Sequence, residues 1–244
     1  MSEPENTRAR YYPLFLDIGG RTCLVVGGGA VGERKVRTLL EHGARVRLVA
    51  RELTPWLEEE CAAGGIILAG TEYGKAHLQG AVLVFAATSD AELNRAVSED
   101  ARGLGTWCNM ATDPELGSFI VPSLVQRGPL AIAVSTAGLS PAIARVLRIR
   151  LEGQFGAEWE FFILLLGELR KFLKSRGIEE KDSRRVFSEL AALPLPEWIA
   201  EGGREKAFQK VSEICGPLLG GDELQPIWDK LWKPFSSSSQ RFAT

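Results

Sequence analysis

The sequence has little histidine and no paired cysteines, and each shortage excludes a class of site. Its two histidines, His42 and His77, do not form the HExxH pattern of zinc hydrolases. The four cysteines are Cys23, Cys61, Cys108 and Cys215. None forms a C-x-x-C pair, and three of them lie in or beside apolar stretches. We therefore expect reduced thiols in a cytoplasmic protein, with no bound metal.

Long apolar runs and an excess of charge of either sign are also absent. The longest apolar runs, residues 81–87 and 161–166, are far shorter than the ~20 residues that span a bilayer. The polar first 12 residues lack the apolar core of a signal peptide. A formal net charge of −2 argues against the broadly basic surface of a nucleic-acid binder. We therefore expect no membrane or nucleic-acid partner.

The first 150 residues alternate between β-branched runs and helical patterns, which is typical of a parallel sheet covered by helices. Strands are predicted at 22–26, 45–49, 66–68, 82–86, 106–109 and 130–134. Helical spacing of apolar residues predicts one helix over 34–41 and another over 93–104. The sequence therefore predicts an α/β fold, with a Rossmann-like parallel sheet domain over residues 1–139.

The pattern changes at Ser140-Pro141, a strong helix start. The helix that follows has one apolar face, made of Ile143, Val146, Leu147 and Leu151. Further helices are predicted at 183–192, 205–215 and 222–232, and we expect a disordered tail over 236–244. An apolar stripe consists of Trp159, Phe162, Ile163, Leu166, Leu169, Phe172 and Leu173. This stripe fits either core packing or a helix–helix dimer interface.

A glycine motif lies between the first predicted strand and the first predicted helix. The sequence is rich in glycine, with 26 residues, and Gly27, Gly29 and Gly32 form the pattern G-x-G-x-x-G. In such a turn the first glycine makes the bend, the second admits a pyrophosphate and the third allows close helix packing. The motif with its flanking strand and helix predicts dinucleotide binding.

Two residues after the second predicted strand bear on the choice of cofactor. Arg51 suits the 2′-phosphate of NADP, whereas Glu52 suits the ribose hydroxyls of NAD. These residues alone leave the choice open. After the fourth strand, Thr88 follows two small residues and is expected to lie beside the nicotinamide half.

Polar residues follow the fifth and sixth predicted strands, where ligands bind in open α/β sheets. The candidates for substrate contact and catalysis are Asn109, Thr112, Asp113, Ser118, Ser135, Thr136 and Ser140. Turn-making and helix capping alone also explain such residues. Arg145 and Arg148 lie three apart on one predicted helix. They fit either a solvated face or a site for a ligand rich in carboxylates.

With these residues in place, the chain resembles the precorrin-2 dehydrogenase family of siroheme synthesis, also found as the N-terminal part of siroheme synthase. The matching segments include VVGGGAVGERKVRTLLEHGA, AATSDAELN, CNMATDPELGSFIVPS and GPLAIAVSTAGLSPAIARVLR, within residues 12–151. The resemblance implies oxidation of precorrin-2 to sirohydrochlorin with NAD. It also implies a homodimer whose helical region, over residues 140–235, helps to form the site. Some relatives insert iron as well.

The resemblance also assigns residues. Ala30 and Val31, with Arg51 and Glu52, match cofactor-contacting places, which favours NAD. The family usually has Asp where this chain has Thr112, and Asp113 is adjacent. This departure puts an iron-inserting activity in doubt.

We expect the tetrapyrrole to lie over the nicotinamide between the two domains, with its carboxylates on Arg145 and Arg148 and its proton passing to Asp113 or water. Two other interpretations remain open. One is a non-catalytic NAD(H) sensor, and the other is a generic NADP-dependent reductase. The second lacks the Tyr-x-x-x-Lys pair of short-chain reductases.

Overall fold

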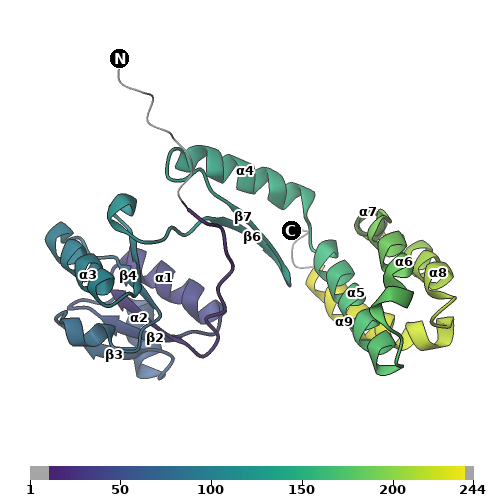
Figure 1. Cartoon of the computed structure of the whole chain (residues 1–244), viewed down its shortest axis with the longest axis horizontal. Helices are drawn as coiled ribbons and strands as arrows, with labels where there is room; N and C mark the ends of the chain where they lie inside the picture. Colours follow the sequence, from purple (N-terminus) through teal and green to yellow (C-terminus); the bar gives the residue numbers. More distant parts are fainter. Residues whose placement is uncertain (1–10, 240–244) are drawn as a thin grey trace, which may run out of the picture. The chain divides into compact units, whose positions relative to one another are not determined.

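A computed structural model of the chain describes residues 11–239, which divide into two compact units (Figure 1). The first unit holds the described residues up to Val121, together with Ala137–Leu139. The second holds Pro122–Thr136 and the described residues from Ser140 onward. Residues 122–136, which lie before the predicted boundary at residue 139, are thus grouped with the helical part of the chain.

The first unit is built on a parallel sheet of five strands in the order β3-β2-β1-β4-β5 (Figure 1). The strands are β1 (Thr22–Val26), β2 (Arg45–Val49), β3 (Ile67–Gly70), β4 (Leu83–Ala86) and β5 (Trp107–Met110). The connecting helices are α1 (Ala30–Glu41), α2 (Pro55–Ala62), η1 (Lys75–Leu78) and α3 (Ala91–Gly103), and η2 (Pro114–Leu116) follows β5. This arrangement confirms the predicted Rossmann-like fold class.

The central strand β1 shows why the sheet is buried on both faces. Cys23 and Val25 pack in the core that includes α1 and α2, whereas Leu24 and Val26 pack in the core that includes α3. Successive side chains of a strand point to opposite faces, so both faces need apolar residues when helices cover both. The strand therefore has a continuous apolar run and ends beside the glycine turn.

The sixth predicted strand is real but lies in a different sheet. β7 (Leu130–Val134) pairs antiparallel with β6 (Ser123–Arg127), which the sequence patterns did not predict. Arg127 pairs with Leu130, so Gly128 and Pro129 form a two-residue turn. Gly128 has a φ of 52°, and glycine favours the positive φ that tight hairpins need. A Gly-Pro turn signal between two short apolar runs was the missed indication of a hairpin.

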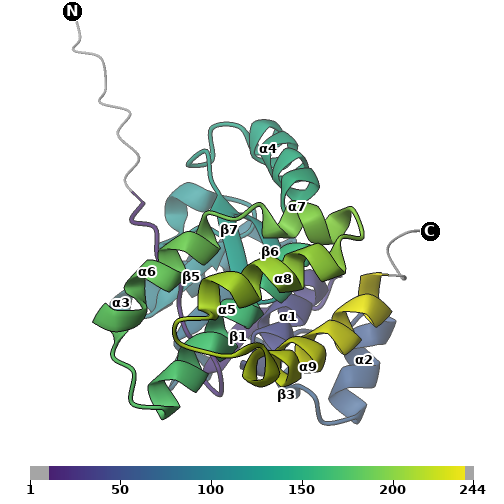
Figure 2. The same ribbon diagram turned by 90° about the vertical axis from the view of Figure 1, so that its right-hand side faces the viewer.

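The second unit joins this hairpin to a set of helices (Figures 1 and 2). They are α4 (Pro141–Gln154), α5 (Glu158–Ser175), α6 (Glu180–Ala191), α7 (Leu195–Ala200), α8 (Arg204–Cys215) and α9 (Gly221–Ser239). The predicted start of α4 is confirmed, since the Ser140 side chain accepts a hydrogen bond from the Ile143 N–H. α5 packs against α6, α7 and α9, and α8 packs against the same three helices.

The apolar stripe on α5 is core. Leu169 and Leu173, which the stripe predicts, are buried together with Phe161, which it does not. Phe161 lies edge-on to the fully buried Trp228 of α9, with ring centroids 5.0 Å apart. The core interpretation of the stripe is therefore confirmed.

The end of the chain differs from its prediction. α9 continues to Ser239, so residues 236–239 are helical and are not part of a disordered tail. The rest of the predicted tail, residues 240–244, lies outside the described residues. Every helix within residues 11–239 is too short or too polar to cross a bilayer.

Candidate cofactor site

Packing explains two glycines of the motif. Gly27 has a φ of 118°, and a Cβ there would lie 2.5 Å from the Ala87 carbonyl oxygen at the end of β4. A Cβ on Gly32 would overlap the Gly27 carbonyl oxygen. Both residues must therefore be glycine to bring β1, α1 and β4 together.

Gly29 is different, because no residue between 11 and 239 would clash with a side chain there. Its φ is −80°, and a Cβ would have no atom within 4 Å. Gly29 is the N-cap of α1 and supplies no capping side chain, whereas Thr54 caps α2 and Asp90 caps α3. The start of α1 therefore has open space beside Gly29 and no capping side chain from the described residues. Such a helix start binds phosphate.

The residues that follow Gly29 complete this surface. Ala30 and Val31 begin α1 and are exposed, and the Val31 side chain is 39% exposed although it is apolar. The exposed glycine backbone and the uncapped start of α1 fit the pyrophosphate of a dinucleotide. The apolar side chain of Val31 fits the adjoining parts of the same molecule. NAD would be held here by Gly29, Ala30 and Val31.

The loop after β2 is fastened to the glycine turn. The Thr54 N–H donates to the Gly28 carbonyl oxygen at 3.1 Å, and a Cβ on Gly28 would overlap the Glu52 carbonyl oxygen. Close approach of the two loops requires glycine at this position as well. The contact places the predicted ribose-binding residues Arg51 and Glu52 next to the phosphate site.

Arg51 forms an ion pair with Glu72. Its Nη2 lies 3.0 Å from Oε1 of Glu72, in the loop after β3. Glu72 was not among the predicted site residues, because no apolar period or turn motif singles it out. The side chains of Arg51 and Glu72 are 77% and 75% exposed.

A buried asparagine organises the loops that follow β4 and β5. Asn94, on α3, is 0% exposed. Its Oδ1 accepts from the backbone N–H of Thr88 at 3.1 Å and from the Thr88 hydroxyl at 2.8 Å, while its Nδ2 donates to the Thr88 carbonyl at 3.0 Å. Asn94 therefore fixes the predicted cofactor residue Thr88 through its N–H, its hydroxyl and its carbonyl group.

The same amide reaches the next loop. Asn94 Nδ2 lies 3.5 Å from the hydroxyl of Thr112, and the Ala111 N–H donates to the Ala86 carbonyl at 3.1 Å. Asn94 thus links the ends of β4 and β5. Asn94 was not among the predicted site residues, since a single polar residue in an amphipathic helix gives no periodic signal.

The other polar residues around β5 also have structural partners. Asn109 is buried, and its Nδ2 donates to the Phe119 carbonyl at 3.1 Å. Ser118 Oγ accepts from the Cys108 N–H at 2.7 Å. The Asp113 carboxylate accepts a hydrogen bond from the Glu115 N–H at 3.2 Å, and Asp113 directly precedes η2. The predicted roles of Asn109 and Asp113 in substrate binding and catalysis stay predictions.

The remaining predicted substrate residues belong to the second unit. The Thr136 hydroxyl donates to the Ser140 carbonyl at 3.0 Å, and Ser135 directly follows β7. Arg148 pairs with Glu152 one turn later on α4. Arg145 is exposed and has no ion-pair partner within the described part of the chain. Arg145 is therefore the better placed of the two arginines to bind a carboxylate.

Two pKa shifts concern the ionisable groups around the site. The Thr54 hydroxyl, followed by Arg37, holds the pKa of Glu33 below its usual range. These contacts stabilise a carboxylate in the first turn of α1, where the helix dipole also favours it. Burial raises the pKa of the Cys108 thiol to about 11, so this residue stays a neutral core group.

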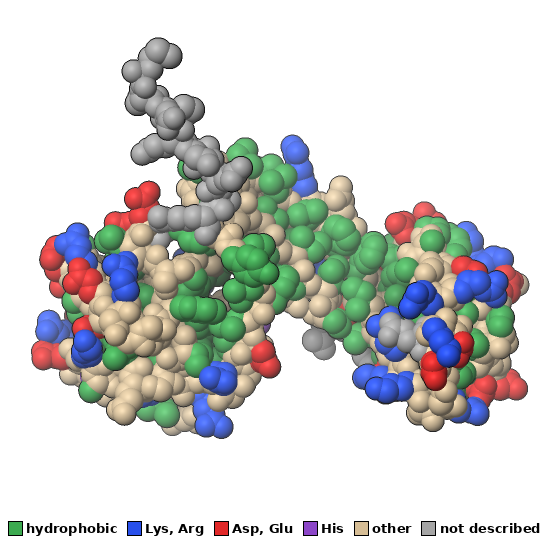
Figure 3. All heavy atoms as spheres, viewed as in Figure 1, with side chains coloured by type: hydrophobic (Ala, Val, Ile, Leu, Met, Phe, Trp, Pro, Cys, Tyr) green, Lys and Arg blue, Asp and Glu red, His purple; other side chains and the backbone are tan. Residues whose placement is uncertain are grey.

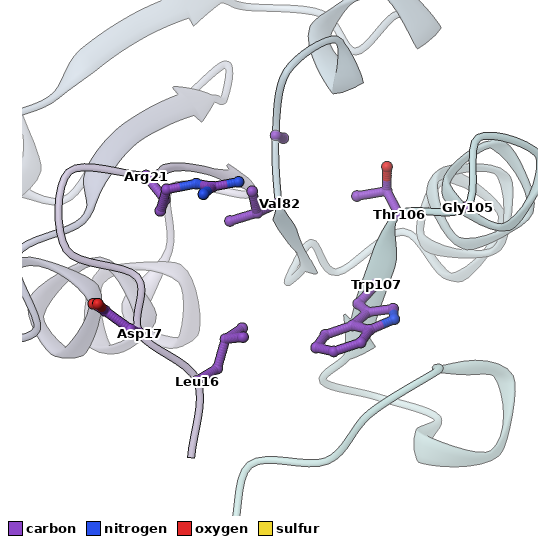
Figure 4. A pocket seen from close by; sticks show the side chains of 8 residues that line it. Leu16, Asp17, Arg21, Val82, Gly105, Thr106 and Trp107 are labelled. Carbon is purple, nitrogen blue, oxygen red and sulfur yellow. The ribbon is translucent and has the colours of Figure 1, made fainter. Parts of the chain in front are cut away.

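A small hollow lies at the opposite edge of the sheet, where the strands begin (Figure 4). It measures about 300 Å³ and has Leu16, Arg21, Val82 and Trp107 among its lining residues. The glycine turn lies at the carboxyl ends of the strands, so this hollow is separate from the cofactor site. Within residues 11–239, no group of three or more His, Cys, Asp or Glu side chains is arranged to hold a metal ion.

Comparisons with known proteins agree with this geometry. Residues 14–123 match a family described as NAD(P)-binding, and residues 127–154 match the central part of sirohaem biosynthesis proteins. Siroheme synthase of Methylobacillus flagellatus is 39% identical over 212 residues, which cover 87% of this chain and 45% of that protein. Siroheme synthase of Stutzerimonas stutzeri is 37% identical, covering 83% of this chain and 44% of that protein. The chain is therefore related to siroheme synthases over the part of them that it covers.

This relationship confirms the resemblance stated from the motifs. The match of residues 14–123 confirms a nicotinamide dinucleotide as the cofactor and supports NAD. The chain spans less than half the length of these siroheme synthases. A solved structure described as SirC, precorrin-2 dehydrogenase, has a TM-score of 0.68 and covers 83% of this chain and 100% of that one. At 23% identity, this likeness supports the fold.

Proposed function

We propose that this chain is an NAD-dependent precorrin-2 dehydrogenase that forms sirohydrochlorin in siroheme synthesis. The observation that carries the proposal is the open, uncapped start of α1 at Gly29 in a chain related to siroheme synthases. We also propose that the protein is cytoplasmic, as its cysteine pattern predicts.

In this reaction the substrate loses two hydrogens, one as a hydride and one as a proton, and gains a double bond. NAD supplies the hydride acceptor when bound. The protein's contribution is to place the substrate carbon against the nicotinamide and to receive the proton. The ordered Thr88 and Thr112 loops position the reacting groups through Asn94. Asp113 or water takes the proton.

The proposal does not include iron insertion. The family usually has a carboxylate at the place of Thr112, and here that place holds a hydroxyl directed at Asn94. A hydroxyl at this place supplies neither the negative charge for a metal ion nor a base for the pyrrole protons. The proposed activity is therefore the dehydrogenase step alone.

The test is to mix the purified protein with precorrin-2 and NAD⁺ and to record NADH and sirohydrochlorin absorbance. A dehydrogenase forms both products. An NAD(H) sensor binds the nucleotide without turnover, and a generic reductase instead acts with NADPH. Either of these results would reject the proposal.

Asp113→Asn is predicted to lower kcat by about tenfold or more, because general bases contribute at least that much. The asparagine oxygen still accepts from the Glu115 N–H and keeps the loop ordered. Asp113→Ala should be impaired to a similar degree, with unchanged NAD⁺ affinity in both variants. Full activity in the asparagine variant would assign the proton to water.

We also propose that the protein is a homodimer that associates through α4 and the β6–β7 hairpin. Ile143, Val146 and Leu147 share one face of α4 and are 52%, 44% and 38% exposed. Figure 3 shows hydrophobic side chains gathered over α4 and the hairpin. A two-stranded hairpin is marginally stable on its own, and an exposed apolar patch of this kind marks an interface. A second copy would cover this face.

Ile143→Glu combined with Val146→Glu is predicted to convert the dimer to a monomer of 26.7 kDa, measured by sedimentation. The added carboxylates would be buried without partners in the interface, which is strongly unfavourable. Arg145 lies on the opposite face of α4, so Arg145→Gln should leave the dimer intact. A monomeric wild type, or a dimeric double variant, would contradict the proposed interface.

A further inference from the structure

The ion pair at the ribose end of the cofactor site has a consequence for cofactor choice. Arg51 is the only predicted cofactor residue with a positive charge, and a free arginine at this place would attract the 2′-phosphate of NADP. The structure pairs its Nη2 with Glu72 Oε1 at 3.0 Å. The backbone holds the two loops together, because the Ala50 N–H donates to the Gly70 carbonyl at 3.1 Å, one residue before Arg51 and two before Glu72.

Arg51, Glu52 and Glu72 together carry more negative than positive charge. Glu72 neutralises Arg51, and Glu52 next to it has no ion-pair partner among residues 11–239. The Glu52 carbonyl oxygen lies against Gly28, so Glu52, which is exposed, adjoins the glycine turn. A free carboxylate accepts hydrogen bonds from two ribose hydroxyls but repels a phosphate that carries nearly two negative charges.

We propose that Glu72 is a specificity-determining residue, which holds Arg51 and makes the site discriminate against NADP. Glu72 acts in two ways. It occupies the guanidinium group that would bind the 2′-phosphate, and its own charge adds to that of Glu52 in repelling the phosphate. The inference rests on the NAD site described above and not on the identity of the tetrapyrrole substrate.

The test is to measure the dissociation constants of NAD⁺ and NADP⁺ by calorimetry on the full chain. Glu72→Gln keeps the shape of the side chain and removes its charge. Since exposed ion pairs contribute little, we expect NADP⁺ to bind roughly three- to tenfold more tightly, with NAD⁺ changed by less than about twofold. The gain should shrink at high salt, because screening weakens exposed charges.

Two further variants separate the proposed role from a general effect. Arg51→Ala combined with Glu72→Gln should lose most of the gain, since the guanidinium group would be missing. Glu41 is an exposed carboxylate at the far end of α1, so Glu41→Gln should leave both dissociation constants unchanged.

The proposal is overturned if Glu72→Gln leaves the ratio of the two dissociation constants unchanged, or if the double variant gains as much NADP⁺ affinity as the single one. It is also overturned if the wild type binds NADP⁺ as tightly as NAD⁺. Wild-type protein that bound neither nucleotide would instead overturn the NAD site itself.

Discussion

Gly29→Val is expected to weaken NAD⁺ binding by at least about a hundredfold, equivalent to about 2.8 kcal/mol, while leaving the fold intact. Gly29 has an extended backbone and open space where a side chain would project. The valine side chain would fill the place of the pyrophosphate and cover the first N–H groups of α1. Calorimetric titration with NAD⁺ and urea unfolding measure the two effects separately.

Gly32→Ala is the matched control in the same turn. Its Cβ would overlap the Gly27 carbonyl oxygen, so β1 and α1 could not keep their present spacing. We expect a loss of about 2–4 kcal/mol in the free energy of unfolding, within the range of overpacking and backbone strain. Normal NAD⁺ binding by Gly29→Val would contradict the proposed binding of phosphate at the N-terminus of α1. One that unfolded as readily as Gly32→Ala would show that Gly29 is needed for packing.

Asn94→Leu is expected to have the second large effect, on both stability and turnover. Leucine has a similar volume but leaves the Thr88 N–H and carbonyl without their partners. Leaving buried polar groups unpaired costs about 1–3 kcal/mol each. We therefore expect about 2–4 kcal/mol less stability in urea unfolding. Below the unfolding transition, kcat should fall more than NAD⁺ affinity, since the Thr88 and Thr112 loops would lose their shared anchor.

Ser98→Ala provides the comparison for Asn94. Ser98 lies one turn further along α3, is also buried, and donates a hydrogen bond of 2.6 Å to the Leu116 carbonyl. Its loss should cost about 1 kcal/mol and should leave kcat nearly unchanged. If Asn94→Leu lowered stability without lowering kcat at a temperature where it is folded, Asn94 would be a structural residue and not a positioning residue.

Much of the fold could be predicted from the sequence because the signals were local. The glycine turn, the β-branched runs and the Ser140-Pro141 helix start each depend on neighbouring residues, and the structure contains all of them. The β6–β7 hairpin was missed because strand pairing depends on distant partners. The antiparallel pairing of β7 cannot be read from an apolar run that suits a parallel sheet equally well.

The site was predictable to a smaller extent, for a related reason. Gly27, Gly29 and Gly32 occur at a fixed spacing, so a motif identifies them. Asn94 and Glu72 act through contacts 6 to 21 residues away in the chain, with Thr88 and Arg51 respectively. Only the folded sheet brings such pairs together. Sequence spacing alone therefore predicted a phosphate-binding turn but not the residues that order the surrounding loops.

The most direct measurement is a single turnover of precorrin-2 with NAD⁺, comparing wild type with Gly29→Val. The wild type is predicted to form one NADH for each sirohydrochlorin, and Gly29→Val to form neither at the same NAD⁺ concentration. Wild-type protein that binds NAD⁺ but leaves precorrin-2 unchanged would contradict the proposed dehydrogenase activity.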